Sequence, residues 1–433
     1  MHNLLPSPYD PRLDGLCVRI AASPLHSPIL IARISRLLEG GFKTLWGSSP
    51  EVAPYAVTSG EELELRGCKS LLLVLATGGT EAVALEAVEK AKEEGVPVLL
   101  AAQPYANSLP SLLEVKPLLK GPGVSWIYLG SLDPRSTEAL RTLEQGVRGL
   151  WAASRVRGSR IAAIGPPSPW LVSSRAWHED LARLGVELVE VDPIEFARYV
   201  AEESVPESLG EEVLRRGEVL DLADGEPKKS LRVYRAIKRM WKSRGLDAVS
   251  PACWWFYKEA GANACLAHSL LNDEGLVVGC EGDIPATLSM MLATYASGKP
   301  AFFANPAHVS RDSLLLAHCT APFSMGLRIQ FRRHFITGGS VTSSVWFPKG
   351  SKVTVSRLDP GLEVLRVGVG IIEKGRPEAE MQCESQMLVR MPGAARILEE
   401  SIGNHYVATL GDSSEALRVA ADILGLRLEV ISP

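Results

Sequence analysis

Two acidic residues, Glu281 and Asp283, follow directly on the apolar run Leu276–Gly279 and Cys280. A helix is expected to begin at Pro285, so Asp283 has the position of a helix N-cap. Glu281 has no such structural task. A carboxylate at the end of a buried strand is costly unless it is paired or bound to a metal ion. We therefore expect Glu281 to have a function, whereas Asp283 can serve as a cap, as a functional group, or as both.

Two histidines occupy comparable positions. His318 ends the apolar run Ser313–Ala317, and His405 lies in a turn just before the strand-like segment Val407–Leu410. Taken singly, each histidine is more simply explained as a residue whose ring nitrogens form hydrogen bonds with its neighbours than as a metal ligand. Together with Glu281 and Asp283 they form a set of carboxylates and imidazoles of the kind that borderline divalent metals use. The sequence therefore predicts a metal site if the four side chains converge.

Other motifs indicate less chemistry. The turn Thr77-Gly78-Gly79-Thr80 lies between a strand-like run and a helical pattern, which is where α/β sheets bind ligands. It has neither the GxGxxG pattern nor the lysine of a phosphate-binding loop, so we expect a tight turn that can touch a polar substrate rather than a nucleotide site. No GxSxG motif of a serine hydrolase is present. Cys280 and Cys319 flank the candidate residues, and we interpret both as small packing residues.

The elements that position these residues suggest three domains. The chain has 433 residues, which is more than one core usually supports. Strand-like and helical segments alternate up to about residue 299, with an expected boundary at Arg157-Gly158-Ser159, and short β-rich segments follow. We predict an N-terminal α/β domain over residues 1–157, a central α/β domain over 158–299 that carries Glu281 and Asp283, and a β-rich C-terminal domain over 300–433 that carries His318 and His405. The expected fold class is α/β: two Rossmann-like, doubly wound domains followed by a C-terminal domain with an antiparallel sheet or barrel.

Composition excludes several classes of protein. Lys and Arg number 46 against 50 Asp and Glu, a net charge of −4, which argues against a nucleic-acid partner held by a basic surface. We expect no membrane partner either, because no apolar run approaches the roughly 18 residues of a membrane helix. The start of the sequence lacks the pattern of a secretory signal, so we predict a cytoplasmic location. Seven scattered cysteines without a CxxC pair lead us to expect neither a disulfide framework nor a structural zinc site.

Several segments spread over nearly the whole chain carry a family resemblance. They are ATGGTE (76–81), QPYANSLP (103–110), IGPPSPWLVSS (164–174), LLNDEGLVVGCEGDIPATLSMML (270–292), SGKPAFFANPAHV (297–309), LLLAHC (314–319) and GNHY (403–406). In these segments the chain resembles the superfamily of L-fucose isomerase and L-arabinose isomerase, and more closely its shorter members. The resemblance implies two Rossmann-like domains and a C-terminal domain that contains a β-barrel, assembled as a homo-trimer or homo-hexamer.

The resemblance also implies a chemistry, the interconversion of an aldose and a ketose with Mn²⁺ or a similar divalent ion such as Co²⁺. Glu281 resembles an acidic metal ligand and acid/base of the arabinose isomerases, and Asp283 resembles part of the acidic pair of the fucose isomerases. His318 and His405 match the two metal-binding histidines. The residues that we expect to contact the sugar are Ser168, Trp170 and Asn305.

The sequence departs from the family pattern at a second acid/base carboxylate. In arabinose isomerases it follows the strand that here ends in Ala304-Asn305, and in fucose isomerases it lies on the helix that here offers Ala264 or Cys265. Glu259 is the nearest carboxylate in sequence. We therefore predict a metal-dependent aldose–ketose isomerase, an intramolecular oxidoreductase that acts on a small sugar through a cis-enediol. The alternative is a relative on the same fold that binds sugar without catalysis or with altered chemistry, and a dehydrogenase is disfavoured because GxGxxG is absent.

Overall fold

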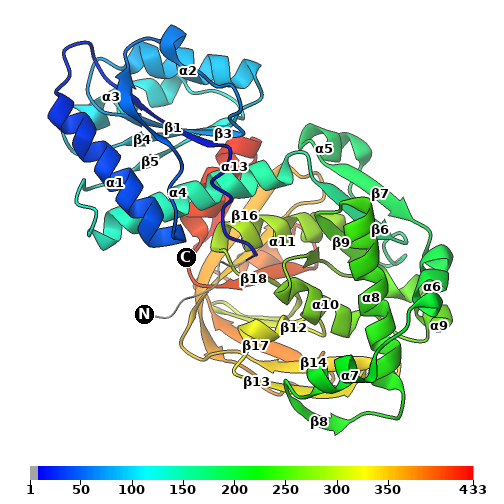
Figure 1. Ribbon diagram of the computed structural model, residues 1–433. Helices are drawn as coiled ribbons and strands as arrows, with labels where there is room; N and C mark the ends of the chain where they lie inside the picture. The colour runs from blue at the N-terminus through cyan, green and yellow to red at the C-terminus, as the bar shows by residue number, and fades with distance from the viewer. Residues whose placement is uncertain (1–7, 433) are drawn as a thin grey trace. The chain divides into compact units, whose positions relative to one another are not determined.

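The computed structural model describes residues 8–432, the side chains of residues 54 and 55 excepted, and it contains two compact units (Figure 1). The first unit comprises the residues up to Arg155 together with Glu415–Arg427, and the second comprises Val156–Ser414 and the chain from Leu428 onward. The predicted domain boundary near residue 157 stays a prediction. The further division at residue 299 stays a prediction, because residues 158–299 and 300–414 both lie in the second unit, whereas Glu415–Arg427 belongs to the first.

The first unit is built on a parallel sheet in the doubly wound order β2-β1-β3-β4-β5. Its strands are β1 (Leu16–Ala21), β2 (Val52–Val57), β3 (Ser70–Leu75), β4 (Val98–Ala102) and β5 (Val124–Tyr128). Its helices are α1 (Pro28–Trp46), α2 (Glu81–Glu93), α3 (Ser108–Val115), α4 (Thr137–Val156) and α13 (Ser414–Leu424). Strands β3 and β4 are almost continuously apolar because they are buried on both faces.

The glycine turn between β3 and α2 is a tight turn, as expected. Gly79 has a φ of 76°, and a side chain on Gly78 would press against Asn107. The backbone N–H of Gly78 donates to the Ala106 carbonyl at 2.7 Å. Ala106 and Asn107 themselves have positive φ values of 51° and 59°, so two loops with unusual backbone conformations are joined at the carboxyl end of this sheet.

A disulfide joins Cys17 to Cys68, which corrects our expectation that the scattered cysteines provide no disulfide framework. The two residues are 51 positions apart in sequence, but Cys17 lies in β1 and Cys68 just precedes the adjacent strand β3. The parallel register pairs Leu16 with Ser70, so the pair is brought together by strand pairing and not by a local motif. Sequence spacing alone could not show this contact.

The second unit begins with another parallel sheet, in the order β10-β9-β6-β7. Its strands are β6 (Arg160–Ile164), β7 (Glu187–Val191), β9 (Ala248–Pro251) and β10 (Val277–Val278). The helices of this part are α5 (His178–Arg183), α6 (Pro193–Glu202), α7 (Glu207–Leu214), α8 (Glu226–Arg244), α9 (Tyr257–Ala260), α10 (Cys265–Asp273) and α11 (Ile284–Ser297). Helix α11 is buried along nearly its whole length, and it packs against β10 on one side and strands β15 and β18 on the other.

Six antiparallel strands close into a barrel in the order β15-β18-β11-β12-β17-β16, because β16 pairs with both β17 and β15. The barrel strands are β11 (Phe302–Val309), β12 (Ser313–His318), β15 (Lys352–Leu358), β16 (Val364–Lys374), β17 (Ser385–Arg390) and β18 (Tyr406–Leu410). Strand β19 (Arg427–Ile431) adds to β16 outside the ring, and α12 (Arg396–Glu399) lies between β17 and β18. The predicted mixture of parallel α/β sheets and a β-barrel is confirmed.

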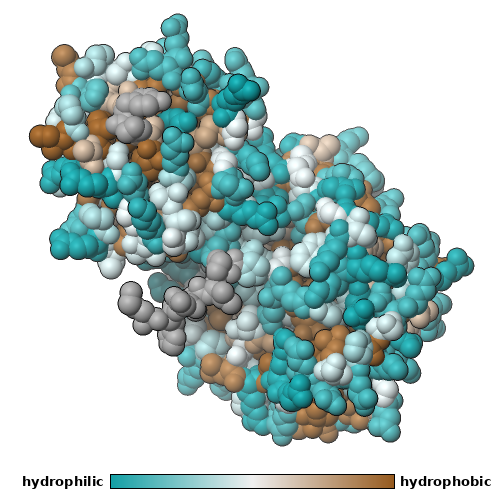
Figure 2. Space-filling view, in the orientation of Figure 1, coloured by the Kyte–Doolittle hydropathy of each residue, from teal (hydrophilic) through white to brown (hydrophobic). Residues whose placement is uncertain are grey.

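A small sheet completes the second unit, in the order β14-β13-β8. Its strands are β8 (Glu218–Asp221), β13 (Arg328–Arg333) and β14 (Val341–Trp346). The face of the molecule visible in Figure 2 is largely hydrophilic, with apolar side chains in small separate groups. Among the described residues, no helix is both long and apolar enough to cross a membrane.

Candidate metal centre

Three of the four predicted ligands meet in the second unit. Glu281, His318 and His405 each present one donor atom, and these atoms lie within 4.8 Å of one another. Glu281 Oε1 is 3.7 Å from His318 Nε2, and Glu281 Oε2 is 3.8 Å from His405 Nε2. Within residues 8–432 this is the only cluster of three or more acidic, histidine or cysteine side chains with that geometry. One carboxylate and two imidazoles suit a borderline divalent cation.

The loop between β10 and α11 presents Glu281 through an unusual backbone. Glu281 has a φ of 58° and Gly282 a φ of 72°, so two consecutive residues are left-handed. For a residue with a Cβ this conformation costs about 1–2 kcal/mol. A side chain on Gly282 would come within 2.9 Å of the Pro167 backbone nitrogen, and one on Gly279 would collide with Thr287. These glycines let α11 and the loop Pro166-Pro167-Ser168-Pro169 (the proline loop) pack closely around Glu281.

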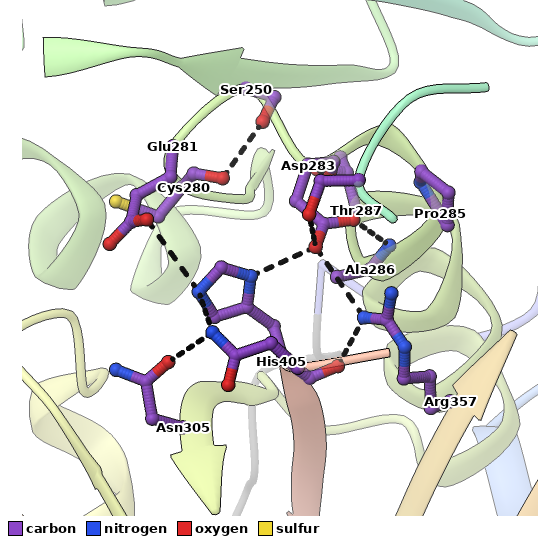
Figure 3. A network of polar contacts seen from close by, with 12 residues as sticks. Ser250, Cys280, Glu281, Asp283, Pro285, Ala286, Thr287, Asn305, Arg357 and His405 are labelled. Atoms are coloured by element: carbon purple, nitrogen blue, oxygen red, sulfur yellow. Dashed lines mark hydrogen bonds and ion pairs between the residues drawn. The ribbon is translucent and has the colours of Figure 1, made fainter. Parts of the chain in front are cut away.

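Asp283 contacts the Nδ1 side of the His405 ring, whereas Glu281 faces Nε2, and Asp283 does not belong to the ligand cluster (Figure 3). Its Oδ1 accepts the Ala286 N–H at 2.8 Å, which confirms the N-cap interpretation. Its Oδ2 accepts hydrogen bonds from His405 Nδ1 at 2.8 Å and from the Ser174 hydroxyl at 2.7 Å. Burial alone would raise the pKa of Asp283, but Arg357 and His405 outweigh burial and hold that pKa below its usual range. Asp283 is therefore ionised and orients the imidazole.

The hydrogen bond to Asp283 also selects the tautomer of His405. An ionised carboxylate only accepts, so Nδ1 of His405 carries the proton and Nε2 keeps its lone pair. Nε2 points toward Glu281, and the Asn404 amide nitrogen lies 3.3 Å from it. A histidine whose Nδ1–H is held by a carboxylate and whose Nε2 carries no proton is the usual arrangement of a metal ligand.

His318 is oriented by a different chain of hydrogen bonds. The Thr320 hydroxyl donates to the Phe303 carbonyl at 3.2 Å, so its oxygen is free to accept from His318 Nδ1 at 3.3 Å. This arrangement leaves the lone pair on Nε2, which faces Glu281. The buried ring of Phe303 packs against both imidazoles, with centroid distances of 5.2 Å to His318 and 4.4 Å to His405.

Electrostatics keep Glu281 ionised. Burial raises the pKa of Glu281, but the proximity of His318 and His405 outweighs burial, and the net pKa lies below the usual range. The side chain is 34% exposed, so it remains accessible from solvent. Glu281 can therefore act as a ligand and as a proton acceptor.

The barrel register explains why residues far apart in sequence converge. Strand β11 pairs with β18 on one side and with β12 on the other. Its residue Ala304 is opposite Tyr406, and Asn305 is opposite Ala317. His405 and His318, each next to one of those partners, thus lie at the same end of the barrel. This end faces the loop that carries Glu281.

The predicted sugar-contacting residues differ in exposure. Ser168 is buried, whereas Trp170 is 57% exposed and packs edge-on against Trp254 with ring centroids 4.8 Å apart. Asn305 is half-buried, and its Oδ1 accepts from Asn404 Nδ2 at 3.0 Å. The three sugar-contact assignments stay predictions. Glu259, on the short helix α9, is exposed and is not part of the ligand cluster.

Three supporting residues were missed in the sequence. Ser174 and Arg357 both contact the Asp283 carboxylate, and Thr320 contacts His318. Ser174 lies in the segment IGPPSPWLVSS (164–174), and Thr320 follows His318 by two residues. Both residues could therefore have been recognised from their closeness in sequence to the candidate motifs. Arg357 carried only a weak signal, a lone charge near the end of the strand-like segment 352–358.

The surroundings of the cluster contain thiols and one unpaired histidine. The five free cysteines are Cys253, Cys265, Cys280, Cys319 and Cys383. Burial raises the pKa of Cys253 to about 12. His268 on α10 is fully buried, and neither ring nitrogen has a hydrogen-bond partner among the described residues. Burial, followed by the proximity of His318, lowers the pKa of His268 to about 3, so it is neutral.

Comparison with known proteins identifies similar isomerases. No family model matches the chain. A sulfoquinovose isomerase from Clostridium sp. (strain MSTE9) is 26% identical over 215 residues, which cover 46% of this chain and 47% of the relative. Sulfoquinovose isomerases from Priestia megaterium and Alkalicoccus urumqiensis are each 29% identical, over 169 residues (37% of this chain, 38% of the relative) and 184 residues (40% and 41%). The chain thus matches less than half the length of these relatives, which support the predicted enzyme class, an isomerase.

Proposed function

We propose that the protein is a divalent-metal-dependent aldose–ketose isomerase that acts on a small sugar. The observation that carries this proposal is the convergence of Glu281, His318 and His405 within 4.8 Å. The donor set fits the ion, because both imidazoles keep the Nε2 lone pair toward the carboxylate. We propose Mn²⁺, with Co²⁺ as a substitute, since carboxylate and imidazole suit both. When bound, the ion would supply a positive charge that stabilises enediolate character in the substrate.

The proposed mechanism assigns the carbon-bound proton to Glu281. Its carboxylate is ionised and partly exposed, so it can take the proton from C2 of an open-chain aldose and return it to C1. A single base on one face of a cis-enediol suffices for both carbon-bound transfers, while the hydroxyl proton passes from O2 to O1 through solvent. His318 and His405 would hold the ion, while Asp283 orients His405 and takes no part in proton transfer. In our proposal, Asp283 is therefore a positioning residue rather than a ligand.

A second candidate function has its own support. The place of the second family carboxylate is taken by Ala304-Asn305 or by Ala264-Cys265, and the carboxylate of Asp283 is fully engaged. Both observations favour a relative that binds sugar without turnover. The two candidates differ in proton exchange, because an enediol exchanges carbon-bound hydrogen with solvent even when net conversion is poor.

The test is deuterium incorporation at C1 or C2 in heavy water, measured by NMR with Mn²⁺ present. Aldoses and ketoses with and without an anionic group would be screened, sulfoquinovose among them. We expect exchange with the native protein, loss of exchange in Glu281→Gln, and unchanged exchange in the matched control Glu259→Gln, which alters an exposed carboxylate. Sugar binding without exchange in any compound would support the second candidate, and equal exchange in Glu281→Gln would refute the assigned base.

We propose further that the protein works in the cytoplasm as a homo-trimer or homo-hexamer, as the family resemblance implies. Light scattering of the full chain would measure the subunit number.

A further inference from the structure

A fully buried arginine contacts the same carboxylate that orients His405. Arg357, on barrel strand β15, has no solvent-exposed side-chain surface. Its Nη1 donates to the main-chain carbonyl of His405 and lies 3.5 Å from Asp283 Oδ2, while its Nε donates to the Ile402 carbonyl at 3.3 Å. The guanidinium thus contacts both the backbone and the orienting partner of one candidate ligand.

Stability alone does not explain this cation. A buried ion pair is often no more stabilising than apolar residues of the same volume, because both charges lose their hydration. Here the arrangement is also incompletely satisfied, since Arg357 Nη2 has no hydrogen-bond partner among the described residues. What the guanidinium does provide is geometry, because its planar donors connect residues 402 and 405 to Asp283 in fixed directions.

Gly403 makes room for the arginine. Its φ is 136°, and a Cβ at this position would collide with the guanidinium of Arg357. The turn between Ile402 and His405 therefore wraps around Arg357, and the course of that turn sets where the His405 ring begins.

We propose that Arg357 is a positioning residue for His405, holding the imidazole with Nε2 toward Glu281 and His318, and that Gly403 is the residue that accommodates it. The inference rests on the proposed function insofar as the cluster binds a divalent ion. It adds that the barrel, through β15, determines the orientation of a ligand contributed by the turn before β18.

The first test is Mn²⁺ binding to the chelator-treated full chain, measured by calorimetry. Loss of an outer partner of a metal-bound histidine typically weakens metal affinity about 10–100-fold, which is the decrease expected for Arg357→Met and for Gly403→Ala. The double variant should bind no more weakly than either single variant, because both remove the same contact. Arg357→Lys keeps the buried positive charge but cannot reach all three acceptors, so it should fold and still bind more weakly than the native protein.

A matched control lies directly across the strand pair. Arg366 is opposite Arg357 in the β15–β16 register, is also buried, and pairs with Glu429 at 2.7 Å rather than with the candidate site. Arg366→Met should therefore retain Mn²⁺ affinity within about threefold of the native value, since it leaves every outer partner of the ligands in place. The proposal is overturned if a folded Arg357→Met or Arg357→Lys protein retains native affinity, or if Arg366→Met loses as much.

A second measurement separates this inference from the proposed function. ¹⁵N NMR of histidine-labelled, metal-free protein reports the tautomer of each ring, and His405→Asn identifies the signal. We expect the Nδ1–H tautomer in the native protein and a mixture of tautomers in Arg357→Lys. If the native protein binds no Mn²⁺, the proposed function fails, but the tautomer result still decides the role of Arg357: an unchanged His405 signal in Arg357→Lys refutes it.

Discussion

The unpaired histidine on α10 gives a prediction whose size follows from its burial. His268 has a pKa of about 3 in the folded chain, against 6.5 for an ordinary histidine in the unfolded chain. Between these values the unfolded state binds a proton and the folded state does not, so stability falls as pH decreases. The slope approaches about 1.4 kcal/mol per pH unit, and from pH 7.5 to pH 5 the loss amounts to about 2 kcal/mol.

Replacement of the histidine should remove this loss. We expect His268→Leu to be no less stable than the native protein at pH 7.5, because no hydrogen bond is broken among the described residues and no charge is lost. At pH 5 the variant should be more stable by about 2 kcal/mol. The measurement is urea denaturation of chelator-treated protein at several pH values. A variant that is destabilised at pH 7.5 and has the native pH dependence would refute the burial argument.

Three further predictions concern other parts of the chain. Gly282→Ala should lower the free energy of unfolding by about 2–4 kcal/mol, because an alanine there strains the left-handed backbone and clashes with the proline loop. Gly47→Ala, whose φ is also positive at 75° but which has no neighbour in the way, should lower it by only about 1–2 kcal/mol. Urea denaturation measures both values, and equal losses would contradict the packing argument. Cys253, with a pKa of about 12, should react with iodoacetamide at pH 8 at least about a hundredfold more slowly than a small-molecule thiol, and mass spectrometry of the modified peptide would measure the rate. Replacing Cys17 and Cys68 by serine opens a loop of 51 residues and should destabilise the first unit by about 4 kcal/mol without changing Mn²⁺ affinity, whereas unchanged thermal unfolding of that unit would contradict the disulfide.

The sequence contained enough information for the ligand cluster but not for its support. Glu281 was recognisable because a carboxylate follows a buried strand, and His318 because an imidazole ends an apolar run. The sequence left two roles open for Asp283, helix capping and a function in the site. In the structure Oδ1 caps helix α11 and Oδ2 contacts His405. Arg357 could not have been assigned, since its contacts depend on which barrel strands are neighbours, and local pattern does not determine that.

The fold was predictable where patterns are local and less so where they are not. The apolar strands β3 and β4 and the glycine turn followed from periodicity and turn residues, and the β-rich character after residue 300 followed from short strand-like segments. The pairing of Cys17 with Cys68 and the assignment of α13 to the first unit both depend on contacts between distant segments. Such contacts leave no trace in residue spacing.

The closed ring of strands restricts how the candidate centre can diverge among homologous chains. His318 ends β12, His405 precedes β18, and β11 lies between them. In a ring without a free edge, an inserted residue in any of these strands would have to be absorbed by both neighbours. Length changes should therefore accumulate in connecting loops such as residues 375–384. The spacing between the two imidazoles is then inherited as a fixed dimension, and new substrate preferences would have to arise from loops around it.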